Sequence, residues 1–174
     1  MIRDFNVLAT TSRGFGRAAC RELKFLLEQV GDNAALVDKT GIAGLVAART
    51  SIDPFEAVKK LKDILNERPY EFRYLFRVIP VERVVRTDLA EIEKAVVELS
   101  GKIVEGECFR ITVEKRFTSL SSHAVIEAVA KNIKRQVKLD KPDKIVLIEI
   151  VGGLTGVSVL TPNDVISVLK EKLL

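Results

Sequence analysis

The first 81 residues alternate strand-like and helix-like segments in a regular order, which constrains the fold more than any other feature of the chain. Short runs of β-branched and apolar residues predict strands, and longer runs with apolar residues every three or four positions predict helices. The predicted strands cover 5–10, 34–39, 45–49 and 72–81, and the predicted helices cover 15–30 and 54–68. The order βαββαβ is that of a ferredoxin-like unit, in which two helices cover one face of an antiparallel sheet.

Two helix starts stand out from the rest of the sequence. Asp53 takes the N-cap position, Pro54 the first helical position, and Glu56 completes a capping box. Asp88 and Glu91 form a second capping box. The helix that follows Asp88 opens the second half of the chain.

The second half predicts the order αβαββα and therefore a layered α/β unit of its own. Its predicted elements are a helix after Asp88, a strand over 108–115, a helix over 121–139, a hairpin of strands 145–151 and 157–160, and a last helix that starts at 161–164. We therefore expect an α/β (α+β) fold with a ferredoxin-like domain at 1–80 and a second domain at 81–174.

Basic residues are concentrated on the predicted helix over 121–139. The spacing i, i+3, i+4, i+7 places four of them on one helical face, opposite a buried stripe. These residues are Lys131, Lys134, Arg135 and Lys138. The helix follows the basic strand end at Lys115 and Arg116, and a serine pair at Ser121 and Ser122 offers free backbone N–H groups at its start. Such a combination suits a phosphate backbone, although an ordinary solvated face would show the same charges.

Further basic residues fall in the first half and at the join between the halves. Arg13, Arg17 and Arg21 lie opposite the apolar stripe of the first predicted helix, where glutamates intervene along the chain. Arg77, Arg83 and Arg86 lie near the join, where RNA contact and pairing between domains are both open.

Composition excludes several classes of protein. The chain has 47% apolar and 30% charged residues, and no apolar run approaches the roughly 20 residues that span a bilayer, so we expect a cytoplasmic protein without a membrane partner. A net charge of +4 is a mild bias toward nucleic acid. Cys20 and Cys108 lack metal or redox spacing, and we expect no metal and no cofactor.

Catalytic residues are hard to find in the sequence. His123 is the single histidine, and neither cysteine has an activating neighbour in sequence. The glycines at 14–16 and 152–156 lack the pattern of a nucleotide-binding loop. The aromatic residues fall mostly on core-facing positions, which favours recognition of a structured, A-form backbone over base stacking.

Several motifs resemble those of THUMP domains. They are the runs 77–82, 87–92, 106–116, 121–123 and 156–160, and weaker likenesses extend over the first half. The resemblance is to stand-alone THUMP proteins that assist acetylation of a tRNA cytidine. It implies tRNA binding, typically at the acceptor region, and an RNA cytidine acetyltransferase or other tRNA modification enzyme as partner. The contacts that the resemblance carries over are Arg110, Lys115, Arg116, Ser121, Ser122 and His123.

The main hypothesis from the sequence is therefore a tRNA-binding adaptor that is not an enzyme and has no catalytic residue of its own. It includes the expectation that catalysis comes from a partner, because the chain ends soon after the last predicted helix. The alternatives are a small tRNA-modifying enzyme that uses His123, and a regulatory subunit that binds an acidic protein. The oligomeric state is left open by the sequence.

Overall fold

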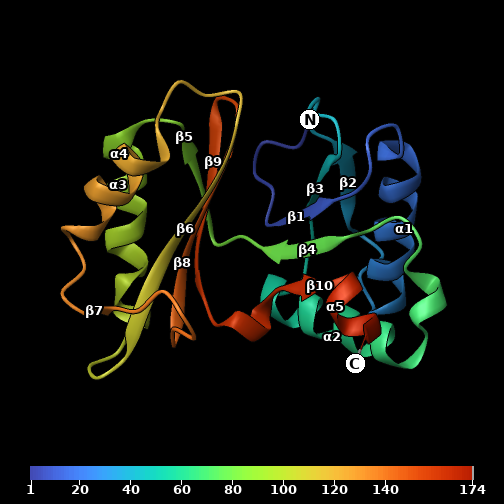
Figure 1. Ribbon diagram of the computed structural model, residues 1–174. Helices are drawn as coiled ribbons and strands as arrows, with labels where there is room; N and C mark the ends of the chain where they lie inside the picture. Colours follow the sequence, from blue (N-terminus) through green and yellow to red (C-terminus); the bar gives the residue numbers. More distant parts are fainter. Residues whose placement is uncertain (174) are drawn as a thin grey trace. The chain divides into compact units, whose positions relative to one another are not determined.

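The computed structural model describes residues 1–173 and divides the chain into two compact units (Figure 1). Unit 1 comprises residues 1–81 and 163–173, and unit 2 comprises residues 82–162. Within the described residues, none of the helices has the length and apolar character needed to cross a bilayer. The expected mixed fold, with helices packed on two separate sheets, is confirmed.

Unit 1 has the predicted order βαββαβ. Its elements are β1 (Val7–Thr10), α1 (Gly16–Gln29), β2 (Leu36–Lys39), β3 (Leu45–Arg49), α2 (Pro54–Glu67) and β4 (Arg77–Pro80), with a 3-10 turn at Pro69–Glu71 between α2 and β4. The strands lie in the order β10-β4-β1-β3-β2, and each neighbouring pair is antiparallel.

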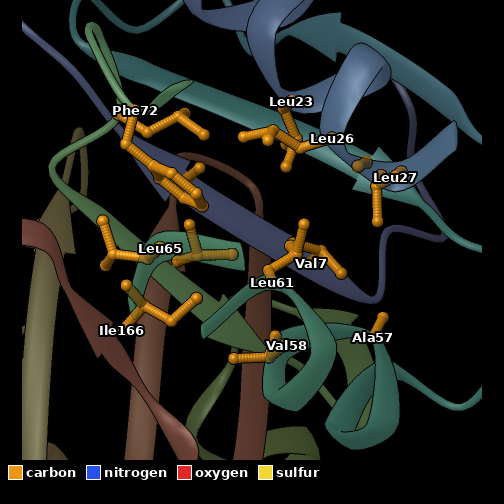
Figure 2. Close-up of a cluster of buried hydrophobic side chains, with 14 of the residues drawn as sticks. Val7, Leu23, Leu26, Leu27, Ala57, Val58, Leu61, Leu65, Phe72 and Ile166 are labelled. Carbon is orange, nitrogen blue, oxygen red and sulfur yellow. The ribbon is translucent and has the colours of Figure 1, made fainter. Parts of the chain in front are cut away.

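The core of unit 1 forms where α1 and α2 pack on one face of this sheet (Figure 2). Helix α1 contributes Leu23, Leu26 and Leu27, whose spacing places them on one side of the helix. Helix α2 contributes Leu61 and Leu65 in the same way. The Asp53 carboxylate accepts hydrogen bonds from the backbone N–H groups of residues 55 and 56 at 2.8 and 3.2 Å, as the N-cap assignment predicts.

The end of the chain differs from the prediction. We expected one helix after 161–164 in a second domain over 81–174, but a 3-10 turn at Pro162–Asp164 is followed by the short strand β10 (Ile166–Ser167) and α5 (Val168–Leu173). Strand β10 pairs with β4, and Ile166 and Val168 are buried in the core of unit 1. Residues 163–173 thus belong with unit 1, because two of their apolar side chains, Ile166 and Val168, complete a core built by the first 81 residues.

Unit 2 contains β5 (Arg83–Arg86), α3 (Leu89–Leu99), β6 (Cys108–Arg116), α4 (Ser122–Ala130), β7 (Gln136–Val137), β8 (Lys144–Val151) and β9 (Leu154–Leu160), with a 3-10 turn at Ser100–Lys102. The strand order is β5-β9-β8-β6-β7. Strand β6 is parallel to β8, and β9 is antiparallel to β8 and to β5. Both helices pack on one face of this sheet (Figure 1).

The predicted helix over 121–139 is too long. Helix α4 ends at Ala130, and its end is tightened by i to i−3 hydrogen bonds from the N–H groups of Asn132 and Ile133. Beyond α4, Val137 of β7 pairs with Phe109 of β6. The Lys138 N–H donates a hydrogen bond to the Phe109 carbonyl at 2.8 Å. Residues 136–138 therefore pair with the edge strand of the sheet, although their apolar spacing also fits a helix.

A buried carboxylate holds two loops of unit 1 together. Asp32, which is 1% exposed, follows α1 and accepts hydrogen bonds from the backbone N–H of Ala34 and from the hydroxyl groups of Thr50 and Ser51. The Ser51 N–H donates to the same carboxylate at 2.8 Å. Burial raises the pKa of Asp32, but the hydrogen bonds from Ser51, Thr50 and Ala34 lower it by more, so that the net shift is downward.

Asp32→Asn should destabilise the protein by about 2 kcal/mol at pH 7, because the amide NH2 group would face donors that now have an acceptor. A carboxyl group with a lowered pKa stabilises the folded state above its unfolded pKa, and this contribution is lost as the pH falls through the folded pKa. Urea unfolding should therefore show the wild-type advantage shrinking below about pH 4. Asp63→Asn, at an exposed position on α2, is the control; equal stability of Asp32→Asn and wild type at pH 7 would refute this role.

Candidate nucleic-acid interface

The parallel strands of unit 2 end at one edge of its sheet. Strands β6 and β8 end in register at Arg116 and Val151, and β5 runs in the same direction and ends at Arg86. Helices α3 and α4 both start after strands that end here, and the tight turn at Gly152 and Gly153 joins β8 to β9 at the same edge. We call this end of unit 2 the carboxyl edge; in open sheets with parallel strands, the corresponding edge is where ligands bind.

Six of the residues predicted to contact RNA lie at the carboxyl edge. They are Arg86, Lys115, Arg116, Ser121, Ser122 and His123. The strands supply the three cations, and the start of α4 supplies the other three residues. Residues that are up to 37 positions apart in sequence are thus brought to one edge by strand pairing.

Arg116 has a structural partner. Its guanidinium Nη1 lies 2.8 Å from Glu149 Oε2, and the two side chains are 21% and 1% exposed. Removing one member of a buried ion pair is strongly destabilising, since it leaves the other charge buried. Arg116 therefore serves the folded state whatever else it contacts.

Arg86 and Lys115 are more exposed than Arg116 and have no carboxylate partner among residues 1–173. Both side chains are exposed, and neither forms an ion pair within residues 1–173. The Lys115 ammonium reaches the Leu120 carbonyl at 3.4 Å, a long hydrogen bond that leaves donors available. Of the three predicted cations at the carboxyl edge, these two are therefore the ones open to solvent.

The start of α4 is capped by Ser121, whose hydroxyl oxygen accepts a hydrogen bond from the Ala124 N–H at 3.0 Å. The N–H groups of Ser122 and His123 belong to the first turn of this helix, which has no intrahelical acceptor for them. The His123 ring is 81% exposed, and its Nε2 lies 3.0 Å from Glu127 Oε1 one turn further on.

Phe117 also lies at the carboxyl edge, and reasoning from the sequence missed it. Its side chain is 82% exposed, and its backbone adopts a φ of +54°. An apolar residue directly after the basic strand end, before a hydroxyl-rich turn, was the available signal. The expectation that aromatic residues fall mostly on core-facing positions does not hold for Phe117.

The second set of predicted RNA contacts lies at the opposite end of unit 2. The four basic residues after α4 are not one helical face, because the helix ends before Lys131; they are spread along a turn and β7 with Arg110 nearby. Lys131 faces Glu93 at 3.7 Å, Arg110 donates to the Leu139 carbonyl, and Arg135 donates to the Ile103 carbonyl. Lys134 and Lys138 are exposed in the same stretch.

In unit 1, Arg13, Arg17 and Arg21 form an exposed row. Arg13 precedes α1, and the other two lie on the helix four residues apart. Glu22 does not neutralise them, because its carboxylate accepts the backbone N–H groups of residues 73–75. The row forms no ion pair within residues 1–173.

The two remaining arginines have separate surroundings. Arg77 is half-buried on β4, where it lines a groove of about 400 Å3 with Phe76 and Val168. Arg83 on β5 lies 3.7 Å from Glu98 of α3, so it pairs inside unit 2.

Both cysteines are free thiols, and residues 1–173 hold no cluster of three potential metal ligands. Burial raises the pKa of the Cys20 thiol, which keeps it protonated.

Comparison with known proteins identifies unit 2. Residues 86–160 match the THUMP domain family. The match runs from the last residue of β5 to the last residue of β9, so it includes the whole carboxyl edge and both helices. This part of the chain is therefore a THUMP domain, as the resemblance in the sequence predicted.

Solved structures share the fold of most of the chain. PH1313 from Pyrococcus horikoshii superposes with a TM-score of 0.61 at 18% identity, over 90% of this chain and 55% of that one. SMU.472, described as a methyltransferase and solved with SAH, gives 0.56 at 14% identity, over 92% and 42%. A 4-thiouridine synthetase in complex with RNA and ATP gives 0.51 at 14% identity, over 90% and 42%. The chain spans about half the length of these proteins. No curated protein sequence matches it.

These comparisons contradict the expectation that the chain is not an enzyme. The fold that extends over nine-tenths of the chain is shared with a thiouridine synthetase and with a protein described as a methyltransferase. The arrangement is thus one that occurs in enzymes, and the adaptor hypothesis was wrong to exclude that class.

Proposed function

We propose that this chain binds tRNA through its THUMP domain and serves a tRNA modification reaction. The observation that carries the proposal is the match of residues 86–160 to the THUMP family, together with the exposed cations that strand pairing gathers at one edge of the same domain. The structure of a 4-thiouridine synthetase with RNA, which has a similar fold, adds support.

The carboxyl edge is the proposed contact surface because its donors suit phosphate. Arg86 offers a fork of N–H donors and Lys115 a mobile ammonium, and both are exposed. The first turn of α4 adds backbone N–H groups at the same edge. The stretch after α4 is a weaker candidate, since Lys131, Arg110 and Arg135 are engaged with groups of the domain itself.

Arg86→Ala with Lys115→Ala should weaken tRNA binding about tenfold and reduce the slope of log K against log salt by about 2, because two phosphate contacts no longer release counterions. Filter binding of unfractionated tRNA over a salt series measures both quantities. Lys59→Ala with Lys60→Ala on α2 removes the same charge and is the matched control.

Arg116 is left intact in this test, because its replacement would destabilise the fold and any loss of RNA binding could then not be interpreted. An unchanged affinity and slope in the Arg86 and Lys115 variant would remove the carboxyl edge as the contact surface. If the wild-type protein itself failed to bind tRNA at low salt, the proposed function would be wrong.

We further propose cytidine acetylation as the reaction that the chain serves, with an RNA cytidine acetyltransferase as the partner. The support is the sequence resemblance carried by the runs 106–116, 121–123 and 156–160. The proteins of similar fold suggest two alternative reactions, methylation and the formation of 4-thiouridine. These three reactions leave chemically different nucleosides in tRNA.

Mass spectrometry of nucleosides from tRNA of a strain that lacks this protein should therefore show loss of acetylcytidine, with methylated nucleosides and 4-thiouridine unchanged. Re-expression of the wild-type chain should restore the missing nucleoside, and the Arg86 and Lys115 variant should restore less of it. Retention of acetylcytidine with loss of a methylated or thiolated nucleoside would reject acetylation and keep the role in tRNA modification.

A further inference from the structure

We propose that Phe117 is a stacking platform for an unpaired nucleobase, next to the phosphate contacts of the carboxyl edge. This inference rests on the proposed function, because it names the part of the RNA that this edge recognises. It also departs from the expectation that the protein reads a folded backbone without stacking on bases.

The conformation of Phe117 is costly and is not explained by packing. A φ of +54° is uncommon for a bulky side chain, which the left-handed region disfavours. The side chain is nevertheless 82% exposed, so no burial offsets the strain. Strained residues that a structure retains without a packing reason concentrate at functional sites.

The other exposed aromatic residues are Phe15, Phe25, Tyr70 and Phe76, all of them in unit 1. The Phe15 ring stacks on Tyr74 with centroids 5.5 Å apart, and Phe25 and Phe76 are about half exposed. Phe117 is more exposed than any of them, and among residues 1–173 no aromatic ring stacks on it.

The backbone around Phe117 is anchored on both sides although its ring is free. Before it, the Gly152 N–H donates to the Arg116 carbonyl at 2.8 Å, and the Arg116 side chain is tied to Glu149. After it, the Leu120 N–H donates to the Thr118 hydroxyl oxygen, and Leu120 packs against the core of unit 2. The ring is therefore presented from a fixed point, which lowers the entropy that a ligand must remove.

The chemistry at this edge fits a nucleobase better than an apolar protein surface. A flat ring beside Lys115 and the start of α4 pairs a stacking surface with phosphate donors, which is how single-stranded nucleic acid is bound. Among the other exposed apolar side chains of unit 2, Val104, Val137 and Leu139 lie toward the opposite end of the sheet, and Val97 and Ile126 lie on α3 and α4. Val104, Val137 and Leu139 therefore do not join Phe117 in one apolar patch of the kind that a protein partner would cover.

The chain contains no tryptophan, so Phe117→Trp gives a single fluorescent reporter at this point. The probes are two hairpin RNAs with the same stem, one blunt and one with four unpaired nucleotides at its end. We expect the overhang RNA to quench Phe117→Trp and the blunt RNA to quench it much less. Val97→Trp, at an exposed position on α3, is the control and should not respond to either RNA.

Affinity measurements on Phe117→Ala complete the test. This variant should bind the overhang RNA about tenfold more weakly than wild type and the blunt RNA equally well, since only stacking is removed. Phe117→Gly should bind like the alanine variant and be at least as stable as wild type, because glycine tolerates the positive φ. A merely structural Phe117 would instead give a destabilised glycine variant.

The outcomes separate this inference from the proposed function. Failure of the wild-type protein to bind either RNA would contradict tRNA binding and the stacking role with it. Tight binding of both RNAs with no discrimination by Phe117→Ala, or no quenching of Phe117→Trp by the overhang RNA, would reject the stacking role alone. Nuclease-insensitive capture of a protein that requires Phe117, without an effect on RNA affinity, would also reject it.

Discussion

The parallel pairing of β6 with β8 decides where the proposed RNA-binding side chains of this protein lie. A parallel pair needs a crossover connection, and here α4 supplies it, so the helix must start at the edge where β6 ends. The same pairing brings the end of β8 and its glycine turn to that edge. The basic strand end, the start of α4 and Phe117 are consequently neighbours, and the proposed contact surface follows from the topology rather than from a charged helix.

The charged residues at this edge divide into two kinds. Arg116 is held by buried Glu149, and this pair fixes the end of β6 from which Phe117 projects. Arg86 and Lys115 are exposed and available to a ligand. The carboxyl edge thus has one cation fixed by a buried partner and two that are exposed. In the basic stretch after α4, Lys131, Arg110 and Arg135 interact with carboxylate or carbonyl groups of the domain itself.

Local signals were enough to predict most elements. Asp53 and Asp88 cap their helices as expected, and the order βαββαβ follows from apolar spacing. The predicted elements were wrong where pairing with a strand distant in sequence competes with the local apolar spacing. Val137 fits a helical stripe but pairs with Phe109. Ile166 lies in a predicted helix but pairs with Val78. Phe117 was missed for a related reason, since the sequence does not show which aromatic rings find a core.

Hydrogen–deuterium exchange of the full chain, with and without tRNA at low salt, tests the central claim most directly. Amide exchange reports where the RNA sits without any substitution in the protein. Binding at the carboxyl edge predicts slower exchange in residues 117–124 and 152–153, with little change in residues 131–139. Protection confined to residues 131–139, or no protection at the carboxyl edge under conditions where tRNA is bound, would contradict the account.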